Sequence, residues 1–154
     1  MSVDFSLTKH IQGLITQIPI SSKSDKCKSL SLVIEPNNFK KYYQLFGKLL
    51  FLKEMEKQDK ICIKRVSASV FSCVYAILYL LDKLDLFNDL YTHCTNNVKI
   101  NQNQYIDEPL KYSLVIEFIE KYLPDDAYSK LTNKLYISYY DVRWKKKITK
   151  HTFT

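Results

Sequence analysis

The chain has 154 residues, of which 46% are hydrophobic and 14% aromatic, and this composition excludes a disordered chain and favours one folded domain. Its two glycines, against roughly 7% in an average protein, count against a Gly-rich phosphate loop or a tight-turn β-barrel. The formal net charge of +7 favours contact with anionic phospholipid or nucleic acid, or describes only a solvated lysine-rich surface.

The four cysteines form no C-x-x-C pair and no Cys/His spacing typical of zinc, so we expect neither a metal nor another cofactor. The chain start does not resemble a signal peptide, which predicts free thiols in a reducing cytoplasm. The longest apolar run, Val70 to Leu81, is shorter than the roughly 20 residues of a membrane span. We therefore expect a cytoplasmic protein that is at most peripheral at membranes. The abundance of Lys, Asn, Ile and Tyr is compatible with an AT-rich genome, such as that of a large DNA virus.

Residues 1–29 are expected to form an N-terminal segment that precedes the main domain. Apolar side chains recur at helical spacing over residues 4–18, which predicts an amphipathic helix that packs on the domain or on a partner. Residues 21–29 are polar and predict a linker. The main domain is then expected to cover residues 30–154.

The main domain opens with two strand–helix units. Residues 30–34 are a short run of β-forming residues that Pro36 ends, and residues 39–57 carry one broad apolar face typical of a helix. Residues 61–66 predict a second strand, and residues 68–81 are apolar on nearly all sides, which predicts a buried helix. Alternating strands and helices indicate an α/β fold with a parallel sheet and right-handed crossovers.

The second half of the domain predicts more helix and then a β-hairpin. The expected elements are residues 83–107 (irregular or partly helical), 108–122 (helix), 124–127 (helical turn), 134–141 (strand), 144–147 (turn) and 148–153 (returning strand).

Three segments carry a resemblance to a known family. The turns after the two predicted strands read EPNNFKK over residues 35–41 and VSASVF over residues 66–71, and LPDDA follows at residues 123–127. In this order and spacing, residues 30–154 resemble the N-terminal half of a patatin-like phospholipase domain. The resemblance implies a partial three-layer α/β sandwich with a mostly parallel central sheet, flanking helices and a C-terminal β-hairpin.

The resemblance also implies positions for the family's site residues. Ser69 falls on the nucleophile of the family's G-x-S-x-G turn, without the two glycines. Asn37 and Asn38 stand at glycine positions of its oxyanion loop, Lys40 matches the basic position, and Lys41 replaces the last glycine. The catalytic aspartate of a D-G-[GA] motif has no counterpart, because the chain contains no Asp-Gly. These losses argue against catalysis, since glycine permits the sharp turn and the close approach of oxyanion donors.

Each candidate has a structural alternative. In the functional interpretation Ser69 is a surviving nucleophile. In the structural one it is an N-cap or a small packing residue at the start of the buried helix. Lys40 and Lys41 contact an anionic group at a helix N-terminus, or are ordinary surface charge. The run Trp144-Lys145-Lys146-Lys147 contacts an anionic membrane surface, or is an exposed hairpin turn.

We therefore expect a binding, interaction or structural protein that is related to lipid acyl hydrolases and lacks their activity. One alternative is an active phospholipase that uses Ser69 with an aspartate from another chain. A third is a basic nucleic-acid-binding protein, which only the charge and aromatic content favour. A domain shortened in this way also predicts an exposed sheet edge or apolar face, and hence self-association or a protein partner that covers the missing half.

Overall fold

The computed structural model describes residues 5–17, 28–35, 42–69, 72–96, 108–141 and 146–150. The strands are β1 (Lys28–Ile34), β2 (Ile61–Ser69), β3 (Leu135–Asp141) and β4 (Lys146–Lys150). The helices are α1 (Phe5–Thr16), α2 (Tyr42–Lys57), α3 (Ser72–Leu80), α4 (Phe87–Asn96), α5 (Glu108–Tyr122) and α6 (Ala127–Leu131), with a 3₁₀ turn, η2 (Leu84–Leu86), before α4.

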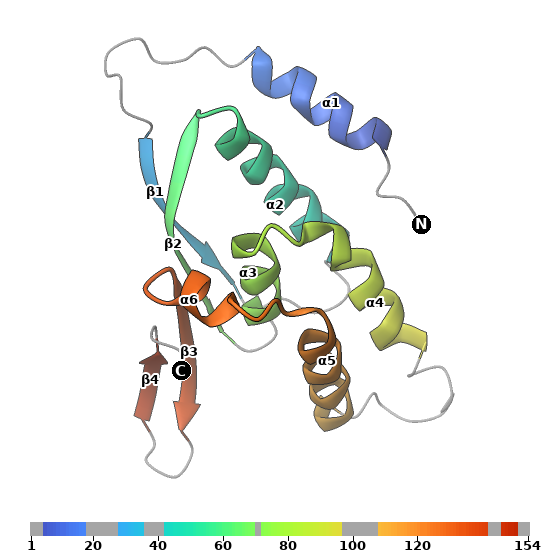
Figure 1. Ribbon diagram of the computed structural model, residues 1–154, viewed down its shortest axis with the longest axis vertical. Coiled ribbons are helices and arrows are strands. Elements are labelled where there is room, and N and C mark those ends of the chain that lie inside the picture. Colours follow the sequence, from blue (N-terminus) through green and yellow to red (C-terminus); the bar gives the residue numbers. More distant parts are fainter. Residues whose placement is uncertain are drawn as a thin grey trace.

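The strands form one four-stranded sheet in the order β1-β2-β3-β4 (Figure 1). The first three strands are parallel, and β4 is antiparallel to β3. The helices between the parallel strands serve as crossovers, as parallel pairing requires. The predicted α/β class, the mostly parallel sheet with flanking helices and the C-terminal β-hairpin are therefore confirmed.

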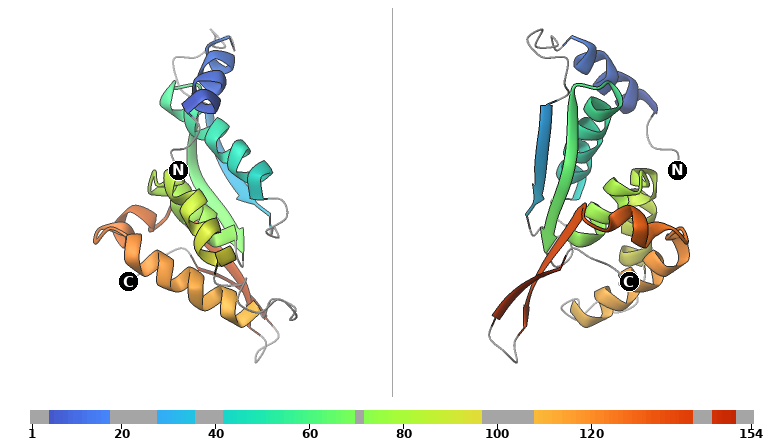
Figure 2. Two further views of the ribbon diagram at one scale, coloured as in Figure 1. Left: turned by 90° about the vertical axis from the view of Figure 1, so that its right-hand side faces the viewer. Right: turned by 60° about the vertical axis from the view of Figure 1, so that its left-hand side comes forward.

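The helices gather on one side of the sheet (Figure 2). Ile34, Val66, Ala68 and Leu135 turn toward them and join one hydrophobic cluster with residues of α1 to α6. Within the described ranges, no helix lies on the other face of the sheet. Of the three layers that the patatin-like resemblance implies, these residues form two, the sheet and the helical layer.

The predicted N-terminal helix is present as α1 and packs on α2. Ile11 and Ile15 of α1 belong to the same hydrophobic cluster as the rest of the core. The Gln12 side chain donates a hydrogen bond from Nε2 to Oε2 of the buried Glu54 on α2, at 3.1 Å. Of the predicted linker, residues 28 and 29 belong to β1, and residues 21–27 lie outside the described residues.

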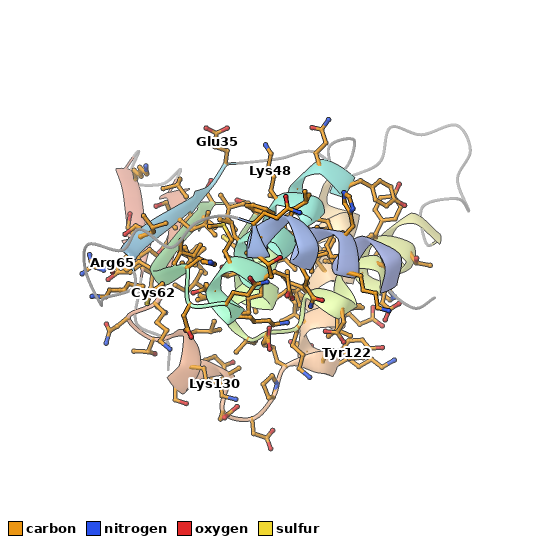
Figure 3. All side chains as sticks on the ribbon, turned by 90° about the horizontal axis from the view of Figure 1, so that it is seen from above. Glu35, Lys48, Cys62, Arg65, Tyr122 and Lys130 are labelled. Atoms are coloured by element: carbon orange, nitrogen blue, oxygen red, sulfur yellow. The ribbon has the colours of Figure 1, made fainter. Side chains whose placement is uncertain are left out.

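A β-bulge in β2 lets Ile63 and Val66 face the helices although they are three residues apart. Leu30 of β1 pairs with Ile63, but Ser31 pairs with Arg65, so Lys64 is the unpaired residue of a β-bulge. Ile63 packs against the core before the bulge, whereas Val66 and Ala68 do so after it. Lys64 and Arg65 are both exposed, and Figure 3 shows Arg65 projecting on the side away from the helices.

The shortage of glycine is visible where helices end. Asp59 and Asp82 adopt positive φ angles of 55° and 58° directly after α2 and α3. Each forms a Schellman end: the Asp59 N–H donates to the Glu56 carbonyl at 3.0 Å, and the Lys60 N–H donates to the Met55 carbonyl at 3.0 Å. Aspartate takes a place where glycine is usual because it tolerates the left-handed region better than most residues.

Several element boundaries differ from the sequence prediction. We predicted that the second strand ends at Val66 and that the helix begins at Ala68, but β2 continues to Ser69 and α3 begins at Ser72. The reason is pairing on both sides, since Ala68 bonds into the ladders of β1 and β3. Lys146 and Lys147, which we predicted in a turn, belong to β4, and residues 144 and 145 lie outside the described residues.

Candidate functional site

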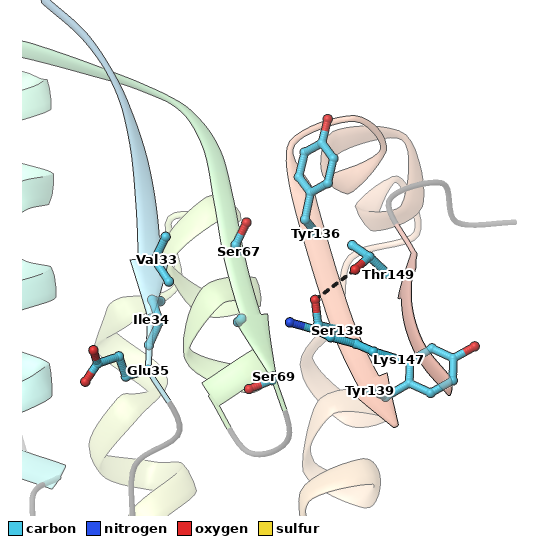
Figure 4. Close-up of a pocket in the computed structure, with 11 residues that line it drawn as sticks. Val33, Ile34, Glu35, Ser67, Ser69, Tyr136, Ser138, Tyr139, Lys147 and Thr149 are labelled. Carbon is cyan, nitrogen blue, oxygen red and sulfur yellow. Dashed lines mark hydrogen bonds between the residues drawn. The ribbon is translucent and has the colours of Figure 1, made fainter. Parts of the chain in front are cut away.

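The open face of the sheet is hollowed near the carboxyl ends of β1 and β2. The hollow, called here the open-face trough, has a volume of about 600 Å³. Its described walls come from the four strands and from Glu35, which directly follows β1 (Figure 4). The side chains that give it its chemistry are Val33, Glu35, Ser67, Ser69, Tyr136, Ser138, Lys147 and Thr149.

Strand register arranges these side chains in rows across the sheet. Val33, Ser67 and Tyr136 pair in one row, and two residues further along Ser69, Ser138 and Thr149 pair in the next. Paired residues share a face, so both rows point away from the helices. The hydroxyl oxygens of Ser138 and Thr149 are 3.0 Å apart and share a hydrogen bond. The floor of the trough is therefore rich in hydroxyl groups.

Two cations accompany these hydroxyls. Lys147 reaches from β4 across β3 toward β2 over the open face (Figure 4). The Arg65 guanidinium lies 5.7 Å from the centre of the Tyr136 ring, a cation–π contact at one wall of the trough. Among the described residues that line the trough, Glu35 is the single acid. This charge balance favours an anion over a cation.

Ser69 lies at the end of β2 and is half-buried on the open face rather than in the core. Its hydroxyl has no hydrogen-bond partner among the residues that the structure describes. Glu35 lies at the end of the neighbouring strand, and Figure 4 shows its carboxylate turned away from Ser69. Within the described ranges, no aspartate or histidine lines the trough. Ser69 thus has an exposed hydroxyl but no aligned proton acceptor.

Ser72, rather than Ser69, makes the side-chain hydrogen bonds at the junction of β2 and α3. This side chain is fully buried at the first residue of α3, and its Oγ accepts a hydrogen bond from the Ser69 N–H at 3.1 Å. The same hydroxyl is 2.5 Å from the Ser69 carbonyl and 3.2 Å from the Ile34 carbonyl, and it donates its one proton to either. Ser72 therefore joins the ends of β1 and β2 to α3. Sequence reasoning missed it, although a serine in an otherwise apolar run was the available signal.

The remaining predicted site residues are not brought to the trough by the described structure. Asn37, Asn38, Lys40 and Lys41, the oxyanion-loop positions, lie outside the described residues. The same holds for Trp144 and Lys145, and only the backbone of Lys146 is described. Of the predicted membrane-contact run, Lys147 alone is placed, and it lines the trough.

The titratable groups with shifted pKa values lie on the helical side of the sheet. Burial raises the pKa of the Cys73 thiol from 9.0 to about 11, so this cysteine is not a thiolate near neutral pH. Burial, and then the hydrogen bond from its hydroxyl to Glu56 at 2.6 Å, raise the pKa of Tyr79. Glu56 also accepts a hydrogen bond from the Ile63 N–H at 2.8 Å, which ties α2 to α3 and β2. This network is structural, since it lies away from the trough.

The described residues offer neither a metal site nor a membrane-spanning helix. No group of three His, Cys, Asp or Glu side chains in the described ranges is arranged to hold a metal ion. No helix there has the length and apolar character needed to cross a bilayer.

Comparison with models of protein families, with curated proteins and with solved structures found no match for the chain.

Proposed function

We propose that this protein is a non-catalytic binding protein whose open-face trough takes an anionic group, the phosphate of a lipid headgroup. One observation carries the proposal: the face of the sheet that no described helix covers holds a hollow lined by hydroxyls and Lys147, and Glu35 is the single acid among its described lining residues. Hydroxyls donate hydrogen bonds to phosphate oxygens, and a lysine supplies the counter-charge. The net charge of +7 adds attraction to an anionic membrane surface.

The shape of the site supports a headgroup rather than the flat plane of a bilayer. The trough is a shallow, open hollow in this face, which can receive a group that projects from the membrane without enclosing it. Val33, which is 68% exposed, offers apolar contact beside the hydroxyls for the glycerol part of a lipid. The resemblance to patatin-like phospholipases also supports a lipid-related ligand.

The absence of catalysis rests on the surroundings of Ser69. A serine nucleophile needs a base within hydrogen-bond reach and donors for the oxyanion. Glu35 points away from Ser69 in Figure 4, and the glycines that would shape the turn are replaced in the sequence. These features support a protein that keeps a hydrolase-like framework for binding alone.

Titration with glycerol 3-phosphate, followed by NMR, together with sedimentation on neutral and anionic phospholipid vesicles, tests the binding proposal. Lys147→Gln should weaken binding about fivefold, because one lysine near an anionic surface contributes about 1 kcal/mol. Lys48→Gln is the matched control, since Lys48 is exposed on α2 and projects away from the protein (Figure 3). Equal losses in both variants would mean diffuse attraction, and shifts outside the trough would place the site elsewhere.

A second candidate function is lipid acyl hydrolysis through Ser69, with an aspartate from another chain. The observation in its favour is that the Ser69 hydroxyl lies in the trough without a hydrogen-bond partner in the described part of the chain. Hydrolysis of a p-nitrophenyl ester and of a phospholipid should give the same background rate for the natural protein and for Ser69→Ala. A rate that depends on Ser69 would replace the binding proposal with this one.

A further inference from the structure

The two edges of the sheet are built differently. The β4 edge is five residues long and carries three lysines, which is how proteins protect an edge from pairing with another chain. The β1 edge is seven residues long, contains no proline, and has its one charge at the first residue, Lys28. Between Ser29 and Ile34 its side chains are serine, leucine, valine and isoleucine.

The outer edge of β1 is also open. In the described ranges β1 pairs with β2 alone, and no other strand lies beside its outer edge (Figure 2). Every second residue of an edge strand directs its N–H and C=O groups outward, and these groups are a template for another strand. An edge of this length without a protective charge is unusual unless a partner covers it.

We propose that β1 pairs antiparallel with β1 of a second copy of this chain, about a two-fold axis at Ser31. A two-fold axis that joins two sheets edge to edge stands perpendicular to them, so residues of the same face must pair. In this register Ser31 meets Ser31 of the second copy, and Leu30 meets Leu32. Leucine is then paired with leucine on the helical side and serine with serine on the open side.

Self-complementarity is what favours a second copy over an unrelated strand. The register brings no like charges together, because Lys28 pairs with Ile34 of the second copy at the end of the strand. It also places Ser29 of the second copy next to Val33, at the wall of the trough. The dimer would join two four-stranded sheets into one, with both helical layers on one face and both troughs on the other.

This interface is independent of what the trough binds, so each proposal can fail alone. Analytical ultracentrifugation of the natural protein from about 1 µM to about 1 mM should show a monomer–dimer equilibrium. Ser31→Lys and Ser31→Glu should each weaken association at least tenfold, because like charges meet on the axis. A 1:1 mixture of the two variants should restore the dimer. Ile116→Lys is the control, since Ile116 is 55% exposed on α5, and it should associate normally.

A second variant tests the same axis without introducing charge. Residues paired directly across an antiparallel ladder have Cβ atoms roughly 4.5–5.5 Å apart, so a short bifunctional thiol reagent should crosslink Ser31→Cys between two copies. Ile116→Cys should not be crosslinked. A natural protein that stays monomeric up to about 1 mM would overturn the proposal. So would charge variants that do not recover on mixing, or a folded Ser31→Cys variant that remains uncrosslinked.

Discussion

The two faces of β2 differ completely in character although their residues alternate along one strand. Val66 and Ala68 point toward the helices and are 0% and 5% exposed, whereas Ser67 and Ser69 point to the open side and line the trough. The buried face is fixed by packing, because removing volume there leaves a cavity. The open face has no such constraint in the described structure, so its residues are free to serve binding.

Substitutions of buried residues and of open-face residues in the sheet should therefore lower the free energy of unfolding by very different amounts. Leu135→Ala removes a side chain that is 0% exposed and should lower the free energy of unfolding by about 2–5 kcal/mol. Ser67→Ala, one row away on the open face, should change it by less than about 0.5 kcal/mol. Urea unfolding followed by circular dichroism measures both. Similar losses of stability in the two variants would mean that the open face is also packed, which would contradict the difference between the two faces.

The helical side also holds a polar network that a change of pH should reveal. Tyr79→Phe removes the hydrogen bond to Glu56 and should cost about 1.5–3 kcal/mol near neutral pH, as expected for a bond to a charged group. The raised pKa of Tyr79 means that the folded state keeps this proton longer than the unfolded state. Its stabilisation is therefore complete below about pH 10 and is lost as the pH rises further.

The alkaline part of this prediction has its own measurement. Urea unfolding between pH 8 and pH 11 should show a steeper loss of stability in the natural protein than in Tyr79→Phe. Burial also raises the pKa of Tyr75 to about 12, so some alkaline loss should remain in the variant. Parallel pH profiles for the two proteins would contradict the role of Tyr79.

Ser69 and Ser72, at the junction of β2 and α3, should differ in how much their side chains contribute to stability. Ser72→Ala should cost about 1–2 kcal/mol, because it leaves the Ser69 N–H without its acceptor at the start of α3. Ser69→Ala should cost less than about 0.5 kcal/mol, since the described structure gives its hydroxyl no partner. Thermal unfolding of both variants tests this difference. A large loss of stability in Ser69→Ala, with almost none in Ser72→Ala, would mean that the Ser69 side chain, and not that of Ser72, stabilises this junction.

We expect the helical layer to gain most of its stability from packing rather than from helix propensity. Replacing a glycine inside a helix measures the contribution of propensity. Gly47 lies inside α2, and a Cβ added there meets no atom within 4 Å. Gly47→Ala should therefore stabilise the protein by about 0.5–1 kcal/mol. Asp59→Gly, at the left-handed end of the same helix, should act in the same direction. A loss of stability in Gly47→Ala, seen in urea unfolding, would indicate that an unseen neighbour occupies this space.

The sequence predicted the order of elements well because most helices have long apolar faces and the last strands alternate. It failed at the junction of β2 and α3, where Ser67, Ala68 and Ser69 alternate like a strand but are continuous with an apolar helix. Pairing with β1 and β3 settles this junction, and pairing is a long-range property. Aspartates with positive φ were equally hidden, since glycine is the usual signal for such helix ends.

The candidate site was predicted in part. Ser69 was singled out from the strand-to-helix turn, and the structure places it in the trough. Lys147 was expected in a turn, and its place over the open face depends on where β4 begins. Tyr136, Ser138 and Thr149 could not be found from sequence, because their proximity to Ser69 arises only when β3 joins the sheet beside β2. These residues lie side by side because of the order of the strands in the sheet, and not because of their spacing along the chain.

The bulge at Lys64 has a consequence for the gene as well as for the fold. In β2, the bulge leaves Lys64 without a partner, so Arg65 pairs with Ser31 and the later residues face the same sides as they would in a strand without Lys64. An in-frame loss of that codon would leave Arg65 directly after Ile63 and still opposite Ser31, so the strand would alternate regularly and no side chain would change sides. Point changes at residue 64 should be tolerated, since this side chain is exposed. The polar character of the open face therefore does not depend on the presence of Lys64.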